Sequence, residues 1–234
     1  MCGRYTLSAT PAELESRFQA ELTDEFSPKY NCAPGQHLPV ITNQDSSIFQ
    51  QSKWGLIAPW ADSPTDGVIN ARAETVDRKP LFEDAYTARR CIVPADGFYE
   101  WAETETGKQP YRVAFEDNRL FAMAGLYRTW ESSHTQTGLG DFTSDKKVDN
   151  SPDRVHSFTI ITTEPNQTVS PLHHRMAAVL QPEHESMWLD GTSEDLKDIL
   201  NPHPSRDWHA YPVSDRVNSP ANDDPELITP EPSG

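Results

Sequence analysis

Cys2 is the residue with the most unusual chemical potential, because it directly follows the initiator methionine. A methionine before a small residue is normally trimmed, and the chain would then begin with an α-amine and a thiol on adjacent carbons. Their ordinary pKa values, about 8 and about 8.5, leave both groups partly nucleophilic near neutral pH. Such an aminothiol can attack an aldehyde twice, forming a Schiff base and then a thiazolidine ring. It could also act on an amide as an N-terminal nucleophile. Alone, Met1-Cys2 also fits an ordinary chain start.

Two further segments carry side chains that could serve such a site. Asn70, Arg72 and Glu74 alternate along the chain, so an extended backbone would place them on one face. The Arg72 guanidinium could hold a phosphate or a carboxylate, or it could form an ordinary surface ion pair. Glu100 lies between two aromatic residues, where a carboxyl group can have a raised pKa and act as general acid and base. An exposed carboxylate at a strand end is the structural alternative.

A histidine pair and a tryptophan segment are the remaining candidates. His173 or its neighbour could move protons near pH 7, although adjacent residues of a strand point apart and only one can face a given site. A buried structural histidine is the alternative. Trp54 and Trp60 offer aromatic faces on which unpaired bases could stack, at about 1–3 kcal/mol each. For Trp54 a position in the core is the favoured interpretation.

The elements that must position these residues are mostly short strands. A helix should begin after Thr10, with Pro11 in its first turn and Glu13 closing a capping box, and run to about Leu22. Residues 28–39, rich in Pro, Asn and Gly, predict a loop. Further helices are expected over residues 81–89, 182–189 and 193–200. Apolar runs predict strands over residues 40–42, 48–53, 91–95, 111–115, 120–126 and 157–163.

This pattern predicts an α+β fold: a single domain with a largely antiparallel, barrel-like sheet at its core and a few peripheral helices. The domain should cover residues 1–222, with a polar insertion at about 131–154 that has no recognisable motif. Residues 223–234 are rich in proline and acidic side chains and predict a tail.

The composition narrows the class of protein. The chain has 234 residues, with 36 acidic against 20 basic side chains and a net charge of −16. This excludes an extended basic surface for nucleic acid, though not a local basic cleft. The carboxylate excess favours a protein of a high-salt cytoplasm, such as that of a halophilic archaeon, over an ordinary acidic surface. Three cysteines without a C-x-x-C spacing predict neither a disulfide framework nor a zinc site, and no cofactor is expected.

No stretch of the sequence approaches the roughly 20 apolar residues of a membrane span, and the N-terminus lacks a secretory pattern. We therefore expect a soluble, cytoplasmic protein with no membrane partner, and a monomer.

Several of these segments occur together in one known family. They are residues 1–5 (Met-Cys-Gly-Arg-Tyr), 30–35 (Tyr-Asn-Cys-Ala-Pro-Gly), 54–57 (Trp-Gly-Leu-Ile), 70–75 (Asn-Ala-Arg-Ala-Glu-Thr), 95–101 (Ala-Asp-Gly-Phe-Tyr-Glu-Trp) and 173–176 (His-His-Arg-Met). In this order they resemble the SRAP family, the SOS response-associated peptidases, over most of the chain. Members of that family process abasic sites in DNA.

The resemblance implies a role for each catalytic candidate. Cys2, freed by removal of Met1, would crosslink to the ring-opened deoxyribose aldehyde of an abasic site in single-stranded DNA, giving a stable thiazolidine. Asn70 would hold the cysteine end and the sugar, and Glu100 would move protons during Schiff-base formation and ring closure. His173 would assist sugar ring opening and reversal of the crosslink. The family also cleaves its own N-terminus to expose the cysteine.

The resemblance also implies DNA contacts, with Arg4, Arg72 and Arg175 on phosphates that flank the lesion and Trp60 wedged or stacked near the site. Two departures from the family pattern affect these contacts. Ala177 stands where a proline usually follows His-x-Arg-Met. The tryptophan loop reads Ile-Ala-Pro-Trp rather than Ile-Pro-x-Trp, which shifts its proline and leaves the placement of Trp60 open.

Two other functions remain open at this point. Cys2 could be the nucleophile of a cysteine peptidase, with His173 as base and Glu100 orienting it. The protein could also be a non-catalytic binder of single-stranded DNA. For the first function, the acidic composition predicts a small basic cleft around Cys2, because a covalent bond does not depend on counterion release as phosphate contacts do.

Overall fold

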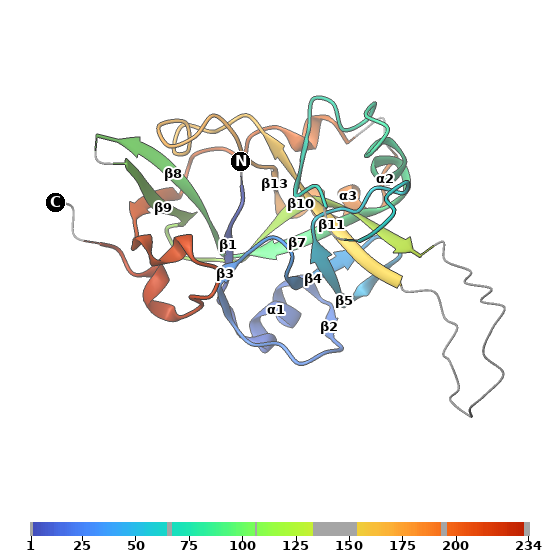
Figure 1. The fold of residues 1–234 in the computed structure, drawn as a ribbon, viewed down its shortest axis with the longest axis horizontal. Helices are drawn as coiled ribbons and strands as arrows, with labels where there is room; N and C mark the ends of the chain where they lie inside the picture. The colour runs from blue at the N-terminus through green and yellow to red at the C-terminus, as the bar shows by residue number, and fades with distance from the viewer. Residues whose placement is uncertain (1, 65–66, 106, 133–153, 193–195, 232–234) are drawn as a thin grey trace.

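The structure is a computed structural model that describes residues 2–64, 67–105, 107–132, 154–192 and 196–231. Its core is built from two sheets (Figure 1). The first has the strand order β14 (Trp208–Pro212), β9 (Gly107–Phe115), β8 (Gly97–Thr104), β1 (Tyr5–Leu7) and β3 (Lys29–Cys32). The second has the order β12 (Met176–Ala177), β11 (Arg154–Thr163), β10 (Phe121–Glu131), β7 (Arg90–Ala95), β4 (His37–Thr42), β5 (Asp45–Trp54) and β2 (Glu21–Leu22). Two short strands join it, β13 (Val179–Leu180) on β10 and β6 (Asn70–Arg72) on β11.

Few helices accompany these strands. They are α1 (Pro11–Phe18), α2 (Glu83–Ala88) and α3 (Glu185–Asp190), with 3-10 helices η1 (Pro182–His184), η2 (Asp198–Leu200), η3 (Asp215–Asn218) and η4 (Pro225–Ile228). Strand pairing is antiparallel except where β5 pairs with β2 and β11 and where β6 pairs with β11. The predicted α+β class with a largely antiparallel, barrel-like core is therefore confirmed.

The first helix begins as predicted but is shorter than predicted. The Thr10 hydroxyl accepts from the Glu13 N–H, and the Glu13 carboxylate accepts from the Thr10 N–H, which completes the capping box. The helix ends at Phe18 rather than near Leu22, because Gln19 takes a left-handed conformation. The chain then enters β2, where Leu22 pairs with Phe49 of β5.

Three other predicted elements differ in the structure. The predicted loop 28–39 contains β3 and the start of β4, because residues 29–32 pair with β1. The predicted helix 182–189 is divided into η1 and α3. Of the predicted helix 193–200, the first three residues lie outside the described part, and the rest ends in η2. Residues 133–153 of the predicted insertion also lie outside the described residues.

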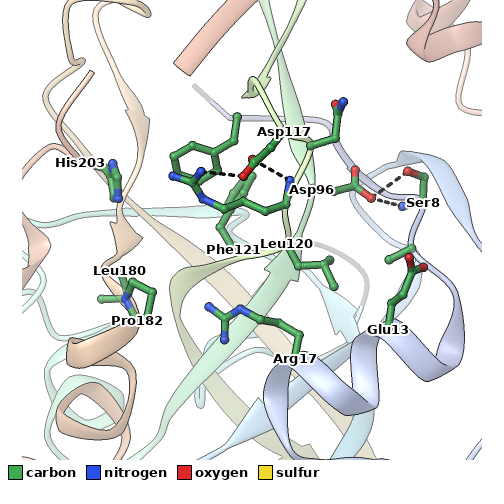
Figure 2. A pocket seen from close by; sticks show the side chains of 14 residues that line it. Ser8, Glu13, Arg17, Asp96, Asp117, Leu120, Phe121, Leu180, Pro182 and His203 are labelled. Carbon is green, nitrogen blue, oxygen red and sulfur yellow. Dashed lines mark hydrogen bonds and ion pairs between the residues drawn. The ribbon is translucent and has the colours of Figure 1, made fainter. Parts of the chain in front are cut away.

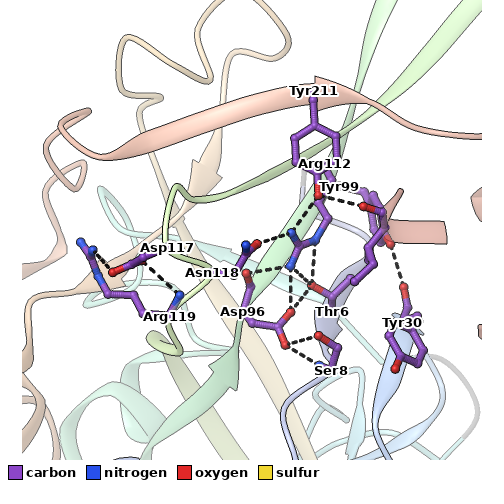
Figure 3. Close-up of polar contacts among 11 residues, drawn as sticks. Thr6, Ser8, Tyr30, Asp96, Tyr99, Arg112, Asp117, Asn118, Arg119 and Tyr211 are labelled. Atoms are coloured by element: carbon purple, nitrogen blue, oxygen red, sulfur yellow. Dashed lines mark hydrogen bonds and ion pairs between the residues drawn. The ribbon is translucent and has the colours of Figure 1, made fainter. Parts of the chain in front are cut away.

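A buried polar cluster ties β1 to β8 and β9 (Figure 3). Asp96 accepts from Thr6 Oγ1, from the Ser8 N–H and hydroxyl, and from Arg112 Nη2 at 3.1 Å. Arg112 also donates to Asn118 Oδ1 at 3.0 Å and to the Tyr211 hydroxyl at 2.9 Å. Gly97 lies against this guanidinium so closely that a Cβ atom would fall 2.7 Å from Arg112 Nε. Glycine at this position therefore leaves room for the Arg112 side chain.

Residues beyond 222 pack onto the first sheet. Asp223 Oδ1 accepts from the backbone N–H groups of Tyr30 and Asn31, and Leu227 is fully buried. The Glu231 N–H donates to the Pro212 carbonyl at 2.9 Å. The described part of the predicted tail, residues 223–231, thus contacts the sheet, and the domain boundary at 222 stays a prediction.

Candidate active site

The pairing of β1 with β8 brings the start of the chain against Glu100. Tyr5 lies opposite Phe98, and the Tyr99 N–H donates to the Arg4 carbonyl at 3.0 Å. The same antiparallel register continued by one residue places Gly3 opposite Glu100. Cys2 is 0% exposed and Glu100 is 1% exposed, so a thiol and a carboxyl group are buried in one small region.

Asn70 holds the cysteine from the other sheet. It opens β6, which lies parallel to β11 with Asn70 opposite Ile160. Its Nδ2 donates to the Cys2 carbonyl at 2.9 Å. Its Oδ1 is buried and has no hydrogen-bond partner among the described residues. A buried acceptor without a donor is unfavourable in a purely structural position, so this oxygen is available to a donor brought by a substrate.

Burial shifts the pKa values of both groups in this region. It raises the pKa of Glu100 to about 7, so the carboxyl group is partly protonated near neutral pH. The pKa of the Cys2 thiol is also raised, mainly by burial and further by the negative charge of Glu100. The thiol is therefore protonated at neutral pH and needs a base to become a nucleophile.

His173 lies beside this carboxyl group. Its Nδ1 lies 3.9 Å from Glu100 Oε2. The same nitrogen lies 3.0 Å from the Arg175 N–H and 3.1 Å from the Arg175 carbonyl. A neutral ring accepts from the N–H, whereas a protonated ring donates to the carbonyl. Burial lowers the pKa of His173, so the neutral ring is the resting form at pH 7.

Glu100 and His173 line a pocket of about 480 Å³ together with other residues, which are Gly3, Arg4, Trp101, Lys108 and Asn218. Trp101 is fixed there by its Nε1, which donates to Asn218 Oδ1 at 2.8 Å. Lys108 comes from β9 and lies opposite Glu103 of β8. Lys108 carries no local sequence signal, because strand pairing brings it to the pocket. Asn218 belongs to a Val-Asn segment, residues 217–218, that also occurs in the SRAP family, and η3 brings it to the pocket. Trp101 follows Glu100 directly, and this position beside a candidate acid is the sequence signal that could have identified it as a pocket residue.

The three arginines predicted to contact DNA phosphates lie in different environments. Arg4 lines the pocket, and its Nη1 donates to the Gly3 carbonyl at 2.9 Å. Arg175 is 9% exposed and forms an ion pair with Glu74, and its Nη2 donates to the Thr162 carbonyl. Arg72 is exposed at the end of β6. The chain turns there, with the Thr75 N–H bonded to the Arg72 carbonyl, so Glu74 does not continue the extended face expected from the sequence.

Trp60 lies outside the lining of this pocket and is 64% exposed. The next residue, Ala61, accepts a hydrogen bond from Trp130 Nε1 at 3.0 Å, which attaches the loop to β10. Trp54, in contrast, is in the core, as expected, with its Nε1 donating to the Ile69 carbonyl. The structure thus brings together Cys2, Asn70, Glu100, His173 and Arg4, while Arg72 and Trp60 are exposed and Arg175 is paired with Glu74.

A second pocket, of about 610 Å³, lies near the opposite end of β1 (Figure 2). It is lined by Ser8, Asp96, Arg17 and His203 among others, and by none of the predicted site residues. Arg17 there is already paired with Glu185. Elsewhere in the described ranges, no group of three His, Cys, Asp or Glu side chains could hold a metal ion. Within the same ranges, the helices are too short and too polar to cross a bilayer.

Comparison with known sequences gives a consistent result. A family described as "SOS response associated peptidase (SRAP)" matches residues 1–220. The chain is 39% identical to the abasic site processing protein YoaM of Bacillus subtilis, with 99% of each chain covered. It is 30% identical to the abasic site processing protein HMCES of Xenopus tropicalis, over 88% of this chain and 67% of the relative.

Solved structures share the fold. A crystal structure of a protein from Bacteroides thetaiotaomicron superposes with a TM-score of 0.83 at 27% identity, covering 98% of this chain and 100% of that chain. A protein from Bordetella bronchiseptica has a TM-score of 0.73 at 21% identity, covering 91% and 100% of the two chains, which is a likeness of fold alone.

Proposed function

Because the chain belongs to the SOS response associated peptidase (SRAP) family, as the resemblance predicted, we propose that it processes abasic sites in DNA by covalent capture through Cys2. Relatives that match over nearly the whole chain are named abasic site processing proteins, which supports this substrate. The observation that carries the proposal is the burial of Cys2 and Glu100 together, with Asn70 bound to the Cys2 carbonyl.

The reaction starts from the ring-opened sugar of an abasic site in single-stranded DNA. The Cys2 amine adds to the aldehyde carbon and water leaves, which gives a Schiff base. The thiol sulfur then adds to the same carbon, the C=N bond becomes single, and the thiol proton ends on the nitrogen. The balance is one aldehyde and one aminothiol giving one thiazolidine and one water. No oxidant, reductant or metal is needed.

Glu100 is suited to the proton transfers of both steps. A carboxyl group with a pKa of about 7 can protonate the departing hydroxyl and then accept the thiol proton. The second transfer matters because burial keeps the Cys2 thiol protonated. His173, 3.9 Å from Glu100, would assist sugar ring opening and reversal of the crosslink, changing between the Arg175 N–H and carbonyl as it gains a proton.

The amine of Cys2 is bonded to Met1 in the full chain, so the proposal requires removal of that residue. Hydrolysis of the Met1–Cys2 peptide bond consumes one water and releases methionine with a free Cys2 amine. We assign this step to the protein itself, as an autopeptidase that uses the same thiol and the same carboxyl group.

DNA contacts around the site would come from Arg4 and Arg72, and from Arg175 if a phosphate replaces its present partner Glu74, with Trp60 offering an exposed ring for stacking. Two basic side chains line the pocket in a chain with a net charge of −16, Arg4 and Lys108, and Lys108 is paired with Glu103 at 3.2 Å. The covalent bond replaces the many phosphate contacts that such a chain lacks. All the residues named belong to one chain, so a monomer in the cytoplasm suffices for the reaction.

The test is incubation with single-stranded DNA containing an abasic site, followed by a denaturing gel. We expect a heat-stable shifted band with the wild type and with the core variant Cys91→Ala. Cys2→Ala and Cys2→Ser should give no band without reduction, because neither can close the thiazolidine ring, and either variant with Met1 removed should give one only after borohydride reduction of its Schiff base. A tag that stays attached before Cys2 should abolish the band.

Other outcomes identify the alternative functions. Intact DNA binding by wild type and Cys2→Ala with no crosslink in either would indicate a non-catalytic binder. Cleavage of added peptides that depends on Cys2, again without a crosslink, would indicate a peptidase. The raised pKa of the Cys2 thiol speaks against the thiolate–imidazolium pair that such a peptidase would use.

A further inference from the structure

A polar pocket of about 740 Å³ lies where the end of β10 meets the C-terminus of α2 and the turn between β4 and β5. Its lining includes two arginines, Arg89 before β7 and Arg128 on β10, and one acidic residue, Asp84. It shares no residue with the pocket around Glu100. The proposed capture reaction gives it no role.

Arg128 is buried without a charge partner. It is 7% exposed, and its Nε is buried with no hydrogen-bond partner among the described residues. Its one hydrogen bond in that part of the chain is from Nη2 to the Leu81 carbonyl at 3.4 Å, the limit of such a contact. No carboxylate of the described residues lies within ion-pair distance. A buried guanidinium in this state is unfavourable unless something else binds it.

The other buried arginines of the described residues have a carboxylate partner or several carbonyl acceptors, which distinguishes them from Arg128, although Arg175 Nε is also buried without a partner. Arg90 donates to backbone carbonyls, including those of Trp188 at 2.6 Å and Tyr86 at 2.9 Å. Arg112 is paired with Asp96, and Arg175 with Glu74. The fold therefore pairs its buried guanidinium groups, and the open donors of Arg128 call for a ligand.

Arg89 adds a second positive charge to the same pocket. Its Nε is also buried and without a partner in the described chain, and its Nη2 lies 3.1 Å from Asp84 Oδ2. The Asp84 side chain is 75% exposed, so water screens its charge. Burial, and then the charge of Arg89, lowers the pKa of Arg128, while the charge of Asp84 raises it in part. The two guanidinium groups therefore repel each other across the pocket. One exposed carboxylate does not neutralise both.

We propose that Arg89 and Arg128 form a binding site for a phosphate group. A phosphate carries up to two negative charges and several acceptor oxygens, so it can accept from both guanidinium forks at once. Asn43 and Thr129 on the rim are polar and fit the same ligand. The site is independent of the capture chemistry, since it shares no side chain with it.

The phosphate could belong to a DNA strand or to a free phosphate or nucleotide. The position of the pocket favours a DNA strand as the ligand. Arg128 and Trp130 are two residues apart on β10 and so lie on one face of it, and Trp130 holds the loop of the exposed Trp60. A strand that stacks on Trp60 could extend along β10 to the arginines.

The first experiment asks whether the site binds phosphate at all. Thermal unfolding is followed with increasing inorganic phosphate against chloride of equal ionic strength, because a ligand of the native state raises the Tm. We expect a rise for the wild type and for Arg206→Gln, an exposed arginine with no ion pair in the described residues. Arg128→Met should lose the rise, and Arg89→Gln should weaken phosphate binding about tenfold.

The Tm of Arg128→Met without phosphate separates ligand binding from structure. Removal of an unpaired buried charge should leave that Tm unchanged or higher. A large fall would mean that the side chain has a structural role and would overturn the proposal. The proposal would also be overturned if phosphate raised the Tm of the wild type no more than chloride does.

The second experiment identifies the source of the phosphate. Binding of fluorescent intact single-stranded DNA is measured by anisotropy at several salt concentrations in the Cys2→Ala background, where no crosslink forms. If the strand is the ligand, Arg128→Met lowers the salt slope by about one phosphate contact. An unchanged slope, combined with a lost phosphate response, assigns the site to free phosphate or a nucleotide. Neither result depends on crosslinking, so the capture reaction is tested separately.

Discussion

The two ends of β1 bury similar polar groups and treat them in opposite ways. At one end, Asp96 and Arg112 are 3% and 1% exposed, and the Asp96 carboxylate accepts from a guanidinium, two hydroxyl groups and a backbone N–H (Figure 3). At the other end, Glu100 is equally buried, and a histidine nitrogen lies 3.9 Å from its Oε2. The same strand thus connects a carboxylate held by several donors with a carboxyl group whose pKa is raised.

The difference shows that burial alone does not determine whether a carboxyl group has a structural role or exchanges protons. Donors around Asp96 satisfy its carboxylate oxygens, so the cluster joins the strands. Around Glu100, burial dominates and raises the pKa to about 7, where loss and gain of a proton are equally easy. Asn70 Oδ1 and Arg4 Nε, also without partners in the described chain, belong to this second end. Buried polar atoms without a partner are therefore part of the end that carries the proposed chemistry, although atoms elsewhere in the described chain, such as Asn31 Oδ1, share this state.

The largest expected effect is a loss of stability when Asp96 is removed from its hydrogen-bonded cluster. Asp96→Ala leaves Arg112 charged and buried without its partner, which should lower the free energy of unfolding by about 3–5 kcal/mol in urea denaturation. Asp117→Ala, at an exposed ion pair with Arg119, is the control and should change it by less than about 1 kcal/mol. Crosslinking per folded molecule should be unchanged in both. An equal loss of stability in the two variants would contradict the distinction between the clusters.

Glu100→Gln tests the other end, where the effect should appear in the rate. Glutamine has the same shape but neither gives nor takes the required proton, so crosslink formation should slow by about 10²–10⁴-fold in a single-turnover gel assay. Glu116→Gln, an exposed residue after β9, should keep the wild-type rate. A normal rate in Glu100→Gln would remove this carboxyl group from the mechanism.

The pH dependence of stability sharpens the same contrast. The folded-state pKa of Glu100, about 7, lies above its ordinary value of 4.5, so the native state holds a proton that the unfolded chain releases. The stability that this proton gives is fully present below pH 4.5 and is lost as the pH rises through 7. Glu100→Gln should therefore be more stable than the wild type by about 1 kcal/mol at pH 5 and by about 3 kcal/mol at pH 8. Urea denaturation at both values measures this, and a difference independent of pH would contradict the raised pKa.

Sequence reasoning reached the parts of the fold that depend on local chemistry. The capping box of Thr10 and Glu13 and the apolar run of β7 are encoded within a few residues. It missed β3, whose Pro-, Asn- and Gly-rich surroundings are typical of a loop. That segment is extended because Asn31 donates to the carbonyls of Val217, Ser219 and Asn222, far along the chain. No local pattern contains that information.

The candidate site shows the same limit. Cys2, Asn70, Glu100 and His173 were named from motifs, and the structure brings them together. The ion pair of Arg175 with Glu74 joins residues 101 positions apart, and it occupies an arginine that the sequence assigned to DNA phosphates. Such pairings depend on how β6 and the segment before β12 meet on β11, which only the tertiary structure defines.

The smallest expected effects come from substituting two asparagines. Asn70 lies at the candidate site, and Asn31 holds β3 in place. Asn70→Ala removes the hydrogen bond to the Cys2 carbonyl, about 1 kcal/mol, and should slow crosslinking about fivefold with little change in stability, because it also removes an unsatisfied oxygen. Asn31→Ala removes bonds to three carbonyls and should lower the free energy of unfolding by about 1–3 kcal/mol while leaving the crosslinking rate of the folded protein unchanged. Single-turnover gels and urea denaturation on both variants decide the matter. If Asn70→Ala lost stability and kept its rate, Asn70 would belong with the structural groups, and the positioning of Cys2 would need another cause.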